Sequence, residues 1–289
     1  MTGRALSRLA ANGPFAAHAA LAAMAVHAVP GLERVDVGAG LVERMLCFSH
    51  GPGLVRMQVS DSGVTVEAPA AVLPEAAARV RRYFDLETDL GQVRAVLARD
   101  PLLAPLVAHR PGLRVLGSFD PFESAACIVL GQQVSLAAAR TLQSRLVAAL
   151  GTPGCDGLSL FPGPRRIAAC PEPELRAAIG LTRSRARTLH GLAEACAAGL
   201  RLDAPLSEVR AALLNLWGVG PWTVDFLSLR ALGDRDACPA GDLVLRRALG
   251  MTTSRDVLAR AAGWSPVRAY AVFHLWTEIG YEAGDTPGR

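Results

Sequence analysis

A Gly-x-Gly step opens a predicted helix in the C-terminal half of the chain. Gly218 and Gly220 bracket one apolar residue, and glycine permits the tight turn that must precede this helix. Pro221 suits a first helical turn, where a missing N–H has no cost. The N–H groups that begin a helix have no partner within it and attract anions. This spacing predicts an anion site, and a nucleic-acid phosphate is the anion we favour.

The second candidate is a lone carboxylate, Asp242, which stands between a Pro- and Gly-containing loop and the helical run 243–249. Taken alone, an aspartate at such a position is most often an N-cap that accepts backbone N–H bonds. A chemical role is compatible with capping, because a helix N-terminus stabilises a charged carboxylate.

Composition excludes whole classes of chemistry. The sequence has no lysine, so all 30 of its Lys+Arg residues are arginine and no side-chain amine can form a Schiff base. Its six cysteines include no C-x-x-C pair, which excludes the usual zinc and disulfide patterns and indicates a reduced, cytosolic protein. The net charge of +4 is compatible with nucleic-acid binding but too small to predict it.

Helical periodicity dominates the second half of the chain. Leu206, Val209 and Leu213 form one apolar face at helical spacing ahead of the Gly-x-Gly step. Ser207 and Ser254 are expected N-caps. The expected helices span 136–150, 173–179, 183–198, 207–216, 222–232, 242–249, 254–262 and 266–279.

The first hundred residues have a different pattern. Short strands are expected at 35–37, 46–48, 55–59 and 64–66, with helices at 18–29 and 74–84. Asp61-Ser62-Gly63 is a hairpin turn signal between two of these strands. The apolar segment 15–29 is too short to span a bilayer. The fold class predicted is α+β: a small antiparallel-sheet domain at 1–112, then a mainly α-helical region at 113–289.

Taken together, these motifs resemble the AlkA-type 3-methyladenine DNA glycosylases of the helix-hairpin-helix superfamily. The run 213–223 is similar to the family's hairpin, and 236–249 is similar to its loop with the catalytic aspartate. Segments 121–123 and 130–135 look like the loop that probes the duplex. The N-terminal domain is similar to half of the TATA-binding-protein fold in the order of its elements. The likeness covers most of the chain, chiefly 111–281.

The resemblance implies a role for each candidate side chain. Asp242 would stabilise an oxocarbenium-like sugar and orient or deprotonate the water that attacks it. Trp222 and Trp276 would line the pocket for a flipped base and favour a cationic, methylated purine by cation–π stacking. Phe226 would share that wall, although core packing explains it equally well.

DNA contacts also follow from the resemblance. Gln133 lies where the family inserts a side chain into the gap left by the flipped base, although the type enzyme has an apolar residue there. Gly218, Gly220 and Thr223 would contact phosphates. Backbone carbonyls at Leu214, Leu216 and Val219 match those that hold a monovalent cation, Na⁺ or K⁺.

The expected function is therefore monofunctional, water-using excision of alkylated purines from double-stranded DNA in base excision repair. Trp222 occupies the position of the Schiff-base lysine in bifunctional relatives. No catalytic cofactor, zinc or iron–sulfur cluster is expected, since no cysteine follows Cys238. We expect a monomer in the bacterial cytosol, associated with the nucleoid and not with membrane. The alternatives are a glycosylase for other damaged bases and a non-catalytic helix-hairpin-helix DNA-binding protein.

Overall fold

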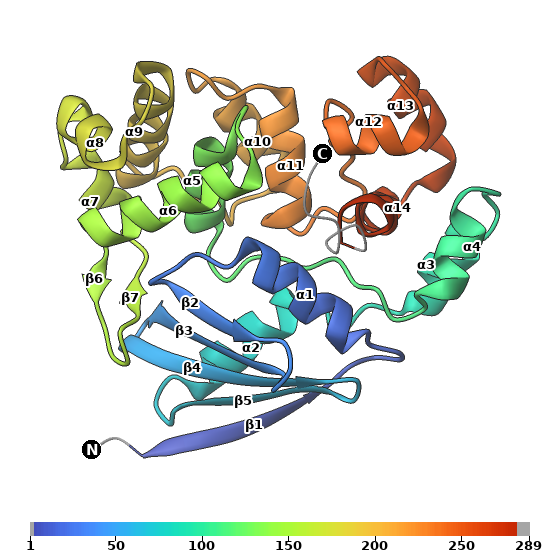
Figure 1. The fold of residues 1–289 in the computed structure, drawn as a ribbon, viewed down its shortest axis with the longest axis horizontal. Coiled ribbons are helices and arrows are strands. Elements are labelled where there is room, and N and C mark those ends of the chain that lie inside the picture. Colours follow the sequence, from blue (N-terminus) through green and yellow to red (C-terminus); the bar gives the residue numbers. More distant parts are fainter. Residues whose placement is uncertain (1–2, 282–289) are drawn as a thin grey trace.

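A computed structural model describes residues 3–281 and places an antiparallel sheet below a layer of helices (Figure 1). The strands are β1 (Arg4–Ala10), β2 (Glu33–Asp36), β3 (Leu41–Phe48), β4 (Gly51–Ser60) and β5 (Gly63–Pro69). They pair in the order β1-β5-β4-β3-β2, each antiparallel to its neighbour. Ser60 pairs with Gly63, so the turn predicted at Asp61-Ser62-Gly63 is confirmed.

Helices α1 (Ala17–His27) and α2 (Leu73–Tyr83) cover the side of the sheet that faces the helical layer (Figure 1). Alternation along the strands explains this, because Val55, Met57 and Val59 are buried while the intervening side chains are more exposed. The four predicted strands correspond to β2–β5. Strand β1 was missed: it pairs with β5 at the sheet edge, and its apolar–polar alternation is weak because Leu6 lies on the exposed face and Ser7 on the inner face.

The rest of the described chain is mainly helical, as predicted. Its helices are α3 (Leu90–Leu97), α4 (Leu103–His109), α5 (Pro121–Gly131), α6 (Leu136–Leu150), α7 (Pro164–Ala168), α8 (Glu172–Ile179), α9 (Arg183–Ala197), α10 (Leu206–Leu214), α11 (Pro221–Arg230), α12 (Leu243–Leu249), α13 (Ser254–Ala261) and α14 (Arg268–Trp276). A 3-10 turn (Ala262–Trp264) precedes α14 and a π-helical turn (Thr277–Tyr281) follows it. Two short strands, β6 (Thr152–Pro153) and β7 (Ser159–Leu160), form a hairpin.

Several local predictions were wrong. Pro121–Glu123 is not part of a loop but the first turn of α5, because Asp120 caps that helix with hydrogen bonds to the amides of Phe122 (2.8 Å) and Glu123 (3.0 Å). The predicted caps Ser207 and Ser254 lie inside helices. Thr253 caps α13, while α10 begins after Pro205 without a side-chain cap.

Two buried clusters organise the molecule. The larger joins the sheet, α1 and α2 to α12–α14, so that Phe84 and Val66 belong to the same core as Trp264 and Tyr270. The second is built from α5 to α11, with members such as Leu189 and Val224. The domain boundary at 112–113 stays a prediction, since residues on both sides of it share the larger core.

A buried ion-pair network ties the sheet to the helical layer. Arg44 on β3, only 3% exposed, donates to Glu33 at 3.0 Å and to both carboxylate oxygens of Glu123 on α5 at 2.8 Å. Its guanidinium also lies 4.6 Å from the ring centre of Phe119. Although burial opposes the charge, the two carboxylates raise the pKa of Arg44 above its ordinary value.

Candidate functional site

Asp242 caps α12, as its position in the sequence predicted. Its Oδ1 atom accepts a hydrogen bond from the Leu245 amide at 2.8 Å. The same oxygen accepts a second bond, at 2.9 Å, from the indole Nε1 of Trp276 on α14. The second oxygen, Oδ2, has no hydrogen bond to any residue in the described part of the chain. The carboxylate is therefore held through one oxygen and presents the other.

The loop before Asp242 is fixed by contacts that the sequence did not reveal. Asp236 accepts two hydrogen bonds from the guanidinium of Arg268, at 2.8 and 2.9 Å, and one from the Ser265 hydroxyl at 2.9 Å. Cys238 is buried, and burial raises the pKa of its thiol to about 11. Because Arg268 begins α14, the loop and the helix that carries Trp276 are fixed to one another.

Three predicted aromatic residues surround this carboxylate. The Trp222 and Phe226 ring centres lie 5.3 Å apart on α11, and Phe226 lies 5.4 Å from Trp276. A Cβ atom on Gly241 would lie 3.4 Å from the Trp222 side chain, so this glycine lets the loop pass against the indole. All three rings are half-buried. The structure thus brings Asp242, Trp222, Phe226 and Trp276 together.

Trp276 has two contacts of different kinds. Its ring packs at a tilt against those of Phe226 and Phe273, while its N–H is directed at the carboxylate. A hydrogen bond to a charged group contributes about 1.5–3 kcal/mol. This tryptophan can therefore both shape an aromatic surface and orient the acid beside it.

The turn between α10 and α11 depends on one glycine, not on two. Gly218 has φ +76°, and a side chain there would overlap Thr188 on α9. Gly220 has φ −107° and open space around its Cβ position. Glycine was expected to permit the turn at both positions, but only Gly218 has a backbone conformation that favours glycine. At that position glycine leaves room in front of the amides that open α11.

Thr223 was predicted to contact DNA, but its side chain is engaged inside the protein. It is 6% exposed, and its hydroxyl accepts a hydrogen bond from Gln132 Nε2 at 3.1 Å. The same amide nitrogen donates to the Gly218 carbonyl at 3.1 Å. Thr223 can therefore offer DNA only its backbone amide, which lies in the first turn of α11.

Gln132 is a functional candidate that the sequence did not single out. Its hydrogen bonds fasten the α5–α6 turn to the α10–α11 hairpin, and Arg185 on α9 donates to its carbonyl at 2.5 Å. The next residue, Gln133, is exposed and has φ +55°. That uncommon conformation marks a sharp turn at Gln133. The predicted probing residue therefore projects beside the hairpin.

The predicted cation ligands are backbone oxygens at the end of α10 and in the following turn. Leu214 is the last residue of the helix, where carbonyls lack intrahelical partners. The Leu216 carbonyl already accepts the Val219 amide at 3.2 Å but retains a second lone pair. Oxygen donors of this kind suit a hard cation, so the residues present fit Na⁺ or K⁺.

A large cavity lies away from this site. About 900 Å³ in volume, it adjoins the opposite end of α11, where Arg230 is about 12 Å along the helix from Trp222. Its lining mixes arginines with carboxylates, among them Arg82, Arg235 and Asp85. Its lining contains no tryptophan and none of the predicted site residues, so we place the chemistry at Asp242.

Residues 3–281 contain no group of three or more His, Cys, Asp or Glu side chains placed to hold a metal ion. No helix in the same range is long and apolar enough to cross a membrane.

Two family descriptions match the chain. Residues 6–120 match the AlkA N-terminal domain, and residues 126–257 match the HhH-GPD superfamily base excision DNA repair protein. A curated relative from Escherichia coli, DNA-3-methyladenine glycosylase 2, is 31% identical over 73% of this chain and 74% of its own length.

A second relative is longer. The probable bifunctional transcriptional activator/DNA repair enzyme AlkA of Mycobacterium tuberculosis is 37% identical over 97% of this chain, which spans 58% of the relative's length. Among solved structures, a 3-methyladenine DNA-glycosylase from Archaeoglobus fulgidus has the same fold, with a TM-score of 0.81, 20% identity, and coverage of 94% of this chain and 97% of its own.

Proposed function

The chain belongs to the HhH-GPD superfamily of base excision DNA repair proteins, and we propose that it is a DNA glycosylase for alkylated purines in duplex DNA. The observation that carries the proposal is the Asp242 carboxylate, hydrogen-bonded by Trp276 and bordered by the rings of Trp222 and Phe226. Relatives whose printed names include 3-methyladenine glycosylase support the same substrate class.

The proposed reaction is hydrolysis of the bond between C1′ of deoxyribose and the purine nitrogen. As that bond breaks, its electron pair leaves with the purine, which neutralises the positive charge of the methylated base. Positive charge develops on the sugar, and the free Oδ2 of Asp242 stabilises it. Water then adds at C1′ and loses its proton to the carboxylate or to solvent. The products are a free base and an abasic site.

The aromatic residues supply selectivity in this proposal. C1′ is inaccessible in a stacked duplex, so the nucleotide must first be extruded. Trp222, Phe226 and Trp276 offer ring faces to the extruded base, and a cationic base gains about 0.5–2 kcal/mol from such a contact. A neutral, undamaged purine lacks this gain and is also a poorer leaving group.

DNA binding is assigned to the hairpin and the turn beside it. Backbone amides at Gly220 and Trp222 face a phosphate, because the open space at Gly220 admits one. Gln133 fills the gap left by the extruded base and hydrogen-bonds the orphaned partner. A monovalent cation on the Leu214, Leu216 and Val219 carbonyls would add positive charge beside that phosphate.

We also propose that the enzyme does not cleave the DNA strand. Strand cleavage through a Schiff base needs an amine, and the chain has no lysine. It would act as a monomer on one lesion at a time, in the cytosol where bacterial DNA is found.

The test is release of bases from methylated duplex DNA by the purified protein. Free 3-methyladenine and 7-methylguanine are expected, leaving strands that stay intact until alkali is added. Borohydride added during the reaction should trap no covalent protein–DNA adduct. DNA binding without base release would instead support the non-catalytic alternative.

A further inference from the structure

An exposed tryptophan on the hairpin is not used by the proposed chemistry. Trp217 is 47% exposed, although tryptophan usually buries its large ring. The Arg187 guanidinium on α9 lies 4.5 Å from the centre of its ring. The two side chains form a stacked pair at the surface, next to the Gly218 turn that packs against Thr188.

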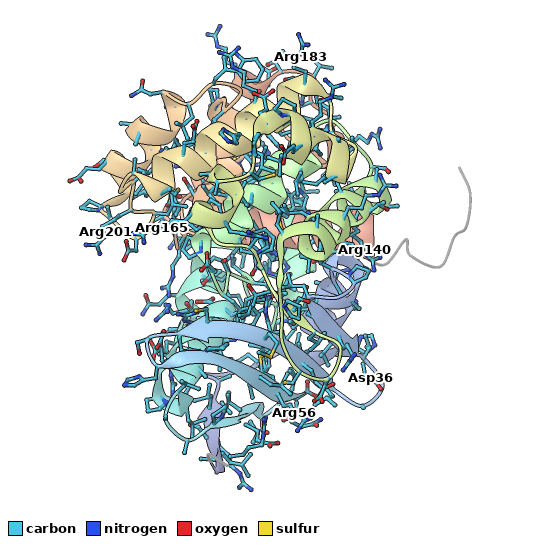
Figure 2. The ribbon with its side chains drawn as sticks, turned by 90° about the vertical axis from the view of Figure 1, so that its left-hand side faces the viewer. Asp36, Arg56, Arg140, Arg165, Arg183 and Arg201 are labelled. Carbon is cyan, nitrogen blue, oxygen red and sulfur yellow. The ribbon has the colours of Figure 1, made fainter. Side chains whose placement is uncertain are left out.

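The surroundings of this pair are electropositive. Arg183, Arg185 and Arg187 lie in the first two turns of α9, and no acidic residue occurs in that helix before Glu194. Within the part of the chain that the structure describes, no carboxylate lies within ion-pair distance of Arg183 or Arg187. The N-terminus of α9 adds a partial positive charge. Figure 2 shows Arg183 at the end of the molecule farthest from the sheet.

We propose that Trp217 and Arg187 act as one unit that binds the DNA backbone beside the hairpin. Arginine stacked on an indole keeps its outer N–H groups free for a phosphate, and the ring holds that planar fork in place. The exposed part of the indole packs on the adjoining deoxyribose. This inference rests on the proposed function, because it takes duplex DNA as the ligand.

The occupant follows from charge and position. Several arginines, two of them without a carboxylate of the described residues within ion-pair distance, favour a polyanion as the ligand. An aromatic ring among these arginines favours a nucleic acid over a simple anion. The Gly220 and Trp222 amides, already assigned to one phosphate, lie three and five residues along the chain from Trp217. A contact there extends the hairpin's footprint on the same strand and reads no base sequence.

The experiment measures affinity for an undamaged duplex of about 20 base pairs by fluorescence anisotropy over a series of NaCl concentrations. Arg187→Ala should weaken binding about five- to tenfold at low salt and lower the salt slope by about one. Trp217→Ala should weaken it comparably, while Trp217→Phe retains most affinity. The double variant should be no weaker than the weaker single variant, since the two side chains act together.

Arg165→Ala is the matched control, because this substitution removes the same charge. Arg165 is exposed and lies on another flank of the molecule (Figure 2). Its affinity should stay within about twofold of the unaltered protein. Base release by Arg165→Ala should also match that of the unaltered protein.

Equal binding by Arg187→Ala and Arg165→Ala, or fully additive losses in the double variant, would overturn the proposal. Failure of the proposed function is distinguishable, because it would abolish base release by the unaltered protein and leave these binding measurements intact.

Discussion

Replacing Asp242 by asparagine isolates the charge of the carboxylate from its structural role. Both hydrogen bonds that hold the side chain, from the Leu245 amide and the Trp276 indole, reach Oδ1. An asparagine whose oxygen takes that place can accept both, and asparagine caps helices about as well as aspartate. The free energy of unfolding should therefore change by no more than about 1 kcal/mol. What is lost is the negative charge, because an amide group replaces the free oxygen.

The expected effect on catalysis is large. A unit charge about 4 Å from the developing sugar cation, in surroundings of effective dielectric constant about 20, contributes about 4 kcal/mol. That figure corresponds to about a thousandfold in rate. Single-turnover release of methylated purines should fall by two to three orders of magnitude in Asp242→Asn, while duplex affinity stays within about threefold.

Asp89 provides the matched control. It caps α3 by accepting the Gly91 amide at 2.8 Å, so Asp89→Asn makes the same chemical change at another cap. Base release by this variant should be unaffected. If Asp242→Asn released bases within about threefold of the unaltered rate, another group would be responsible for the chemistry and the reasoning above would be refuted.

Further predictions concern the surroundings of this carboxylate. Trp222→Leu should slow excision of cationic 7-methylguanine more than excision of neutral hypoxanthine. Trp276→Phe keeps a ring but loses the N–H that donates to Asp242, so it should slow excision of both bases equally. Excision rates on duplexes that differ only in the damaged base test both expectations. Gly218→Ala should lower the unfolding temperature because of its positive φ and the overlap it creates, whereas Gly220→Ala should leave that temperature unchanged and weaken DNA binding. A loss of stability in Gly220→Ala would contradict the assignment of these two glycines. Burial lowers the pKa of His274 from 6.5 to about 4. The folded protein should therefore lose up to about 3 kcal/mol of stability as pH falls from 6.5 to 4, and His274→Asn should flatten that part of the stability curve. A curve unchanged by the substitution would assign the acid sensitivity to other groups.

Periodicity predicted some elements closely but missed α3, although Leu90, Val93 and Leu97 form one buried apolar face of that helix. The range 136–150 is identical to α6, and the predicted strands 55–59 and 64–66 lie within β4 and β5. The edge strand β1 was missed because exposed Leu6 and inward-facing Ser7 break the alternation of apolar and polar residues. Helix α5 was not predicted, and both of its ends were assigned to the loop that probes the duplex, although Asp120 before Pro121 is a sequence signal for a helix N-terminus.

The site was predicted residue by residue but not as an arrangement. Asp242 and Trp276 are 34 residues apart in sequence, so no local rule could place one indole N–H on one carboxylate oxygen. The sequence singled out Gln133, which is exposed, but not its neighbour Gln132. The hydrogen bonds of Gln132 reach hairpin residues 86 and 91 positions away, so no local pattern could predict them. Likewise, the ion pair of Asp236 with Arg268 joins residues 32 positions apart, so the sequence alone could not predict it.

The division of the molecule into two cores has a consequence for the order in which the chain folds. The buried members of the second core lie between Phe122 and Leu227, so all of them are synthesised before α12. The larger core needs partners as far apart as Leu9 and Leu275. During synthesis the hairpin unit can therefore assemble while the carboxylate still lacks the helix that orients it. Trp276 joins Asp242 only when the last helix docks. A chain stopped short of α14 is expected to retain the hairpin without an ordered acid, so competence to bind DNA precedes competence to cut the glycosidic bond.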